Sequence, residues 1–187
     1  IAVTIGPGSF TGLRIGLATA KGLALAADKS IIGIPTLDAI AHNLSWSPDL
    51  LCPMLNARKG EVYTSFYHGG RRITDYQALS PDNLVKTARR IMELTGCSTV
   101  TFLGDGVNEY LPVLQESLGD AVVSLPGYWL PRVSAVGSLA ASRWLGGQLD
   151  DVFSLTPIYV RKSEAEVRMS QLEGGGGFGA ENQRDEA

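Results

Sequence analysis

The 187-residue sequence has few of the residues on which metal sites and disulfide scaffolds depend, and no long apolar run. Its two cysteines, Cys52 and Cys97, follow no metal-ligand spacing, so we interpret both as reduced thiols of a cytoplasmic protein. Its two histidines are isolated from each other. Charged residues interrupt the most apolar stretch before it reaches the ~18 residues of a membrane span. We therefore expect no metal, no disulfide and no membrane association.

The sequence also lacks an excess of positive charge. Sixteen basic and nineteen acidic side chains give a formal charge of −3. This is the wrong sign for a protein that binds the RNA backbone without another subunit. Any RNA would be reached through another subunit. No initiator methionine and no signal-peptide pattern precede the first apolar run, at residues 1–5, which indicates a fragment whose start is missing.

Alternating strand and helix patterns predict an α/β fold. The apolar run 1–5 ends at a Gly-Pro-Gly turn, and helical periodicity follows to about residue 28. The pattern then repeats, with a strand at 31–34 and a helix that begins at Pro35. Two strand–helix units in succession indicate parallel strand pairing.

From residue 51 the pattern changes, and we expect a second domain. Three β-like runs, 51–57, 61–68 and 72–77, predict an antiparallel meander. Helices then alternate with strands up to a last helix capped by Ser134. The predicted divisions are a first domain at 1–48, a second at 49–169 and a flexible, glycine-rich acidic tail at 170–187.

Two glycine turns follow predicted strands, and each is compatible with a phosphate cradle or with a tight turn alone. The first has the spacing G-x-G-x-x-x-G, one residue too long for the dinucleotide fingerprint, and no Lys-Ser or Lys-Thr follows it. In the second, Asp105 either orients a phosphate-bound metal or serves the turn. The candidate phosphate-loop residues are Gly6, Gly8, Ser9, Thr11, Gly104, Asp105 and Gly106.

The helix after the first glycine turn carries small residues at helical spacing. Such ridges let a second helix approach closely, either inside the fold or across a subunit interface. The helix has a single charged stripe, formed by Arg14, Lys21 and Asp28. One ridge consists of Gly12, Gly16, Ala20 and Ala24, and the other of Ala18, Gly22 and Ala26.

The segment 6–16, Gly-Pro-Gly-Ser-Phe-Thr-Gly-Leu-Arg-Ile-Gly, resembles the hallmark motif of the TsaB family, also called YeaZ. The resemblance extends over roughly residues 1–166. Asn56 departs from the family, which often has Asp there, and the opening hairpin with the first phosphate loop of actin-like folds is absent. Further agreement lies at 34–37, 56–63, 104–106 and 157–161.

The resemblance implies an actin-like fold of two lobes, of the sugar kinase, heat-shock 70 and RNase H-like type, with the first lobe incomplete. It implies a catalytically silent partner of TsaD, which transfers a threonylcarbamoyl group to the adenosine beside the tRNA anticodon. The chain then needs no cofactor, and ATP and a metal belong to TsaD. The ATPase TsaE docks on the pair, the chain alone forms a homodimer, and tRNA is reached indirectly.

Family members pair with TsaD through helices of the first lobe. TsaD-like enzymes hold a metal with two histidines four residues apart on a helix, whereas here Trp46 stands four residues after His42. The implied partner interface is Gly12, Leu13, Gly16, Leu17, Ala20, Lys21 and Ala24.

Two other functions compete with the partner subunit. One is an actin-like, ATP-dependent phosphotransferase fragment that uses the two glycine turns, with Asp105 near the metal. The other is a peptidase, for which the sequence shows neither a metal pair nor an activated nucleophile.

Overall fold

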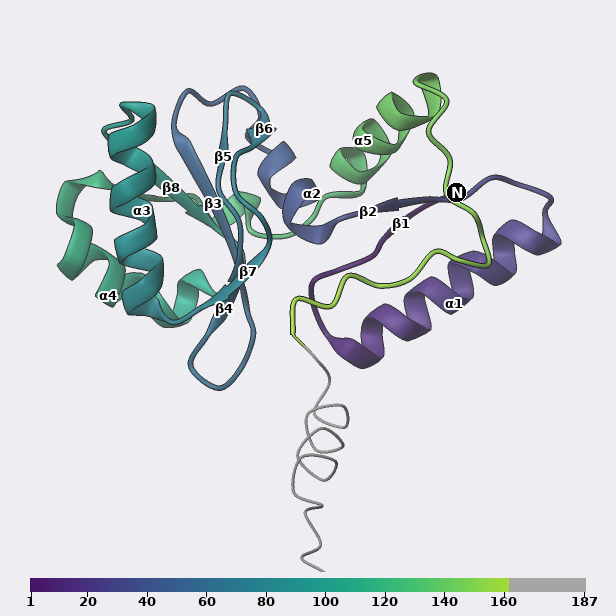
Figure 1. The fold of residues 1–187 in the computed structure, drawn as a ribbon, viewed down its shortest axis with the longest axis horizontal. Helices are drawn as coiled ribbons and strands as arrows, with labels where there is room; N and C mark the ends of the chain where they lie inside the picture. Colours follow the sequence, from purple (N-terminus) through teal and green to yellow (C-terminus); the bar gives the residue numbers. More distant parts are fainter. Residues whose placement is uncertain (162–187) are drawn as a thin grey trace, which may run out of the picture.

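Short runs of β-branched and other apolar residues, bounded by glycine, proline and polar turns, form the strands of this α/β chain (Figure 1). The computed structural model describes residues 1–161. The helices are α1 (Phe10–Ala26), α2 (Thr36–His42), α3 (Pro81–Thr95), α4 (Val107–Leu118) and α5 (Val133–Leu145). The strands are β1 (Ala2–Thr4), β2 (Ile32–Ile34), β3 (Leu50–Asn56), β4 (Val62–Thr64), β5 (Tyr67–His68), β6 (Arg71–Arg72), β7 (Gln77–Leu79), β8 (Val100–Leu103) and β9 (Val122–Ser124). Single 3-10 turns lie at Gly119–Ala121 and Pro126–Tyr128.

The first sheet consists of β1 and β2, which pair in parallel as the two strand–helix units predict. Side chains alternate across this sheet because successive residues of a strand face opposite sides. Ile31 joins the core beneath α1, whereas Ile32 and Ile34 pack with Ala140 of α5. The two helices therefore cover opposite faces of the pair.

The second sheet is built around β3, which pairs in parallel with β8 and antiparallel with β4 and β5. Its larger core lies between the sheet and the helices α3 and α4, with Phe66 and Phe102 fully buried there. A smaller core lies between the sheet and α2, around Leu37 and Ile40. The second sheet is thus also covered by helices on both faces.

The predicted strand 61–68 is interrupted in the structure. Ser65 Oγ donates to the carbonyl oxygen of Thr74 at 2.7 Å, and Phe66 N donates to Thr74 Oγ1 at 2.9 Å. These side-chain hydrogen bonds replace backbone hydrogen bonds between strands, so the run divides into β4 and β5.

The last helix also differs from its prediction, because it begins at Val133 and its N-cap is Arg132 rather than Ser134.

The C-terminal part of the predicted second domain packs against the first sheet. Helix α5 lies against β2 and α2, and Ile158 N donates to the carbonyl oxygen of Ile5 at 2.7 Å. The chain therefore returns to the first sheet after β9 (Figure 1). Local patterns cannot predict this return, because it depends on which sheet has room for a helix. The predicted tail, 170–187, lies outside the described residues.

The two cysteines are free, as predicted, but they differ in burial. Cys52 is fully buried in β3, where desolvation raises the pKa of its thiol to about 12. Cys97 is half-buried, and its Sγ atom lies 3.4 Å from Nδ1 of His68.

Within residues 1–161, no helix is long and apolar enough to cross a membrane.

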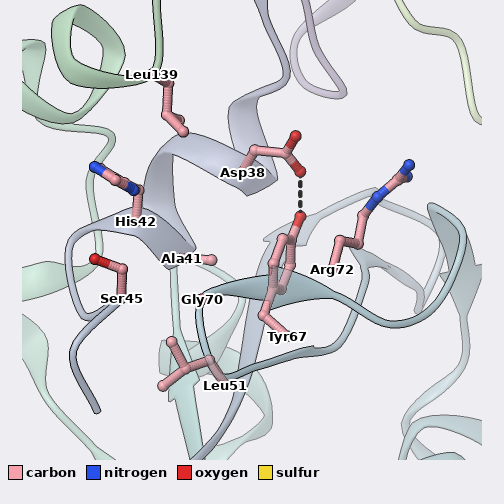
Figure 2. Close-up of a pocket in the computed structure, with 9 residues that line it drawn as sticks. All are labelled: Asp38, Ala41, His42, Ser45, Leu51, Tyr67, Gly70, Arg72 and Leu139. Atoms are coloured by element: carbon pink, nitrogen blue, oxygen red, sulfur yellow. Dashed lines mark hydrogen bonds between the residues drawn. The ribbon is translucent and has the colours of Figure 1, made fainter. Parts of the chain in front are cut away.

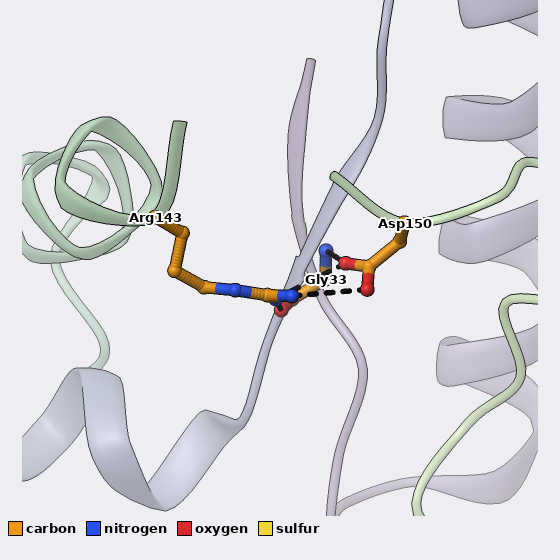
Figure 3. A network of polar contacts seen from close by, with 3 residues as sticks. All are labelled: Gly33, Arg143 and Asp150. Carbon is orange, nitrogen blue, oxygen red and sulfur yellow. Dashed lines mark hydrogen bonds and ion pairs between the residues drawn. The ribbon is translucent and has the colours of Figure 1, made fainter. Parts of the chain in front are cut away.

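A forked ion pair closes the edge of β2 that faces away from β1 (Figure 3). Gly33 N donates to Asp150 Oδ2 at 2.7 Å, and Arg143 Nη1 donates to the carbonyl oxygen of Gly33 at the same distance. Arg143 Nη2 lies 3.0 Å from Asp150 Oδ1. The two side chains thus satisfy the backbone groups that the parallel partner leaves unpaired.

The Arg143–Asp150 pair makes stability depend on pH. Burial raises the pKa of Asp150, but hydrogen bonds from Arg143 and from Gly33 N outweigh it, so the pKa falls below 3.8. We expect Asp150→Asn to lower the free energy of unfolding at pH 7 by about 1–3 kcal/mol. Because the pKa of Asp150 is lower in the folded state, its ionised carboxylate stabilises the fold at higher pH. This contribution to the free energy of unfolding is lost as the pH falls below 3.8.

Urea unfolding of both proteins at several pH values measures the effect. The difference between wild type and Asp150→Asn should be constant from pH 7 to pH 5 and shrink at lower pH. A difference independent of pH down to the acid transition would contradict this account.

Candidate functional site

The outer side of α1 is an exposed apolar surface. Ile15, Leu23 and Leu25 keep 63%, 58% and 54% of their surface exposed. Large contiguous apolar surfaces on a folded chain mark sites of protein contact. The helix adds small, uncharged, exposed residues on the same side, namely Gly12, Gly16, Ala18, Thr19, Gly22 and Ala26. We call these residues, together with Ile15, Leu23 and Leu25, the α1 docking face.

The opposite side of α1 is occupied by the chain itself, which revises the predicted interface. Leu17, Ala20 and Ala24 are buried in the core beneath the helix. Val152 and Ile158, from the returning segment, pack against the same cluster. These three interface candidates are therefore core residues, and a charge placed at Ala20 would unfold the chain rather than test an interface.

The remaining interface candidates differ in exposure. Gly12 and Gly16 are exposed on the docking face, whereas Leu13 and Lys21 are half-buried. The second small-residue ridge, Ala18, Gly22 and Ala26, is exposed along its whole length. Both ridges are visible in the sequence, and only the packing of α1 on the first sheet and on the returning segment distinguishes them.

Two glycines of the docking face have no packing neighbour at their Cβ positions among residues 1–161. A Cβ atom added to Gly16 or Gly22 would meet nothing within 4 Å, and both are interior helix positions, where glycine costs helix stability. Glycine there does, however, let a second helix backbone come close. The two glycines therefore favour a helix contact from outside the described residues.

The first predicted phosphate loop is occupied by contacts within the chain. Gly6 has a φ of 105°, accepts from Thr36 N at 2.7 Å, and would place a Cβ 2.9 Å from the carbonyl oxygen of Ile158. Ser9 Oγ accepts from Gly12 N at 3.3 Å and caps α1. These residues shape the turn and begin the helix. The other two candidates, Gly8 and Thr11, are half-buried and exposed respectively.

The second predicted phosphate loop is packed against β3. Gly104 has a φ of 104°, and a Cβ there would overlap the carbonyl group of Met54. Gly106 N donates to the same carbonyl oxygen at 3.2 Å. Asp105 Oδ1 accepts from Asn56 N at 3.0 Å, so the carboxylate holds the end of β3. The loop connects β8 to α4, and each of its three residues contacts β3.

A pocket of about 110 Å³ lies between α2, the β5–β6 hairpin and α5 (Figure 2). The hydroxyl groups of Tyr67 and Tyr76 both donate to Asp38 Oδ1, at 2.5 and 2.8 Å. Burial and the Asp38 charge raise the pKa of both phenols, so both remain donors. In this view Arg72 and His42 lie on opposite sides of Asp38 and Tyr67. The contacts join α2 to the second sheet.

The histidines do not fit the metal site of TsaD-like enzymes. His42 Nε2 lies 3.2 Å from Ser138 Oγ, and the exposed Trp46 stands where a second histidine would be needed. His68 lies elsewhere, beside Cys97. Among residues 1–161 there is no group of three or more metal-binding side chains. We derive no step through a metal.

The chain is similar to proteins that act in the synthesis of threonylcarbamoyladenosine in tRNA. Residues 1–169 match the family model of TsaD, tRNA N6-adenosine threonylcarbamoyltransferase. The tRNA threonylcarbamoyladenosine biosynthesis protein TsaB of Bacillus subtilis is 30% identical over 169 residues, which cover 90% of this chain and 72% of that protein. TsaB of Escherichia coli is 31% identical, over 86% of this chain and 69% of that protein.

Solved structures show the same fold. YeaZ from Pseudomonas aeruginosa superposes with a TM-score of 0.64 at 22% identity, over 83% of this chain and 72% of that one. A second P. aeruginosa structure, of a protein with similarity to peptidase YeaZ, gives 0.67 at 24% identity, over 84% of this chain and 71% of that one. The fold is the predicted actin-like, RNase H-like α/β fold.

Two substitutions separate the glycines of the docking face from those of the loops. Gly22→Ala should raise the free energy of unfolding by about 0.5–1 kcal/mol, because alanine favours the helix and meets no neighbour. Gly104→Ala should lower it by about 2 kcal/mol or more, because of the positive φ and the overlap with Met54. Chemical unfolding measures both, and equal effects of one sign would contradict the assignment.

Proposed function

Because the chain belongs to the TsaB (YeaZ) family, we propose that it is a non-catalytic partner subunit in tRNA threonylcarbamoyladenosine biosynthesis, which binds and activates TsaD. The observation that carries the proposal is the α1 docking face, an exposed apolar surface with two glycines that no contact among residues 1–161 requires. The TsaD subunit places one of its helices on this face. We place the synthesis of threonylcarbamoyladenosine, and this chain, in the cytoplasm.

The contacts of the candidate catalytic residues support a silent subunit. In both glycine loops, residues that a phosphate or metal would need are engaged with the chain's own backbone: Ser9 with Gly12 N, and Asp105 with Asn56 N. His42 has no second histidine at metal-binding spacing. ATP and the metal are then supplied by TsaD, and this chain supplies binding surface.

A subunit without chemistry changes a rate only by binding one state of its partner more tightly than another. The helix contact stabilises the TsaD conformation that transfers the threonylcarbamoyl group. TsaE docks on the assembled pair, and in the absence of TsaD the same face joins two copies of this chain. The chain's charge of −3 supports indirect rather than direct contact with tRNA.

The Gly22→Leu variant tests the proposal. Leucine at this open position leaves the fold intact but separates the two helix backbones, so affinity for TsaD from the same source should fall at least about 100-fold. Threonylcarbamoyladenosine formation by the mixture should fall with it. Calorimetric titration and a tRNA modification assay measure the two effects.

Gly137→Leu is the matched control, since Gly137 is an exposed glycine of α5 with nothing within 4 Å of its Cβ position. It should bind TsaD like the wild type. Equal binding by Gly22→Leu and wild type would remove the docking face from the interface. ATP turnover by this chain alone, lost in Asp105→Ala, would instead establish the phosphotransferase.

A further inference from the structure

Arg14 is held in one position by two aromatic side chains at the border of the α1 docking face. Its guanidinium carbon lies 4.1 Å from the centre of the Phe10 ring, and its Nε donates to the hydroxyl oxygen of Tyr159 at 3.1 Å. The two rings are themselves in contact, with centroids 5.3 Å apart. Phe10 and Tyr159 are both partly exposed. The cluster thus fixes a cation at the surface.

The fixed guanidinium keeps its fork of donors available. Only Nε of Arg14 has a hydrogen-bond partner among residues 1–161, so Nη1 and Nη2 are unpaired there. A guanidinium edge is shaped to bind a carboxylate through two parallel hydrogen bonds. Because the aromatic contacts already restrict the side chain, little further conformational freedom is lost on binding.

Charge distribution around the docking face indicates what Arg14 meets. Arg14 and Lys21 are the only charged residues of α1, and Lys21 Nζ already donates to the carbonyl oxygen of Phe153 at 3.1 Å. The face itself is uncharged. A partner helix on this face would therefore meet one unpaired positive charge, at the border near the helix N-terminus.

We propose that Arg14 is the carboxylate receptor of the docking face: an aspartate or glutamate side chain of the partner subunit binds across its Nη1 and Nη2 atoms. This inference rests on the proposed function and adds a specificity element to it. Small residues let the two helices approach, and a charge pair at one end selects the register and orientation of the partner. An apolar contact alone would allow the helix to slide.

Two variants of Arg14 test the pair, with TsaD from the same source as the probe. Arg14→Ala should weaken binding about 10- to 100-fold in calorimetric titration. Arg14→Lys places an amine within reach of the same carboxylate, so a zero-length carbodiimide should join residue 14 to an aspartate or glutamate of TsaD. Tandem mass spectrometry of the cross-linked peptide identifies that residue.

Arg132→Ala is the matched control. Arg132 also stacks on an aromatic ring, at 4.6 Å from the centre of Tyr128, but lies away from α1. It should leave affinity unchanged. Thermal unfolding of all variants verifies that the fold persists.

The outcomes separate this inference from the proposed function. If wild type binds TsaD and Gly22→Leu does not, the α1 docking face is the surface that binds TsaD. If, in that case, Arg14→Ala binds like wild type, the carboxylate-receptor inference is wrong and the proposed function still holds. The same conclusion follows if Arg14→Lys cross-links to no carboxylate of TsaD. If wild type does not bind TsaD, both the proposed function and the receptor fail.

Discussion

The fork between Arg143, Asp150 and Gly33 holds the first sheet and the returning chain together, and the packing of α1 depends on both. A parallel pair such as β1–β2 leaves the outer backbone groups of β2 unpaired, and the fork satisfies them. It also anchors the chain where it returns from α5. From Asp150 the chain runs beneath α1, where Ile158 bonds to Ile5. The fork thus helps to hold the returning segment, which buries one side of α1 together with Ile5 and Ile31 of the first sheet.

The consequence is a helix with two different apolar sides. Leu17, Ala20 and Ala24 pack on the returning segment, whereas the docking face, with Ile15 and Gly22, has no cover among residues 1–161. An isolated helix of this composition would be poorly defined, because glycine and apolar residues run around its whole circumference. Burying one side makes the other an oriented surface, and the aromatic cluster around Arg14 marks one end of it.

The same structure explains why a hallmark motif need not be a catalytic one. The glycines of segments 6–12 and 104–106 permit close packing against Ile158 and Met54, and Asp105 holds a strand end. These are requirements of the fold. The proposed function rests instead on two features of residues 1–161, the exposed apolar face of α1 and the unpaired Nη1 and Nη2 atoms of Arg14.

The sequence by itself determined the α/β class, the order of its elements and the hallmark segment 6–16, because these depend on local periodicity and on turn chemistry. It placed α1 to within about two residues, since the Gly-Pro-Gly turn before the helix is a local signal. Three decisions belonged to the tertiary structure: the return of α5 to the first sheet, the side of α1 that is buried, and the clusters around Asp38 and Arg14. The Tyr67–Asp38 and Arg14–Tyr159 hydrogen bonds join residues 29 and 145 positions apart, and no local pattern encodes such a pairing.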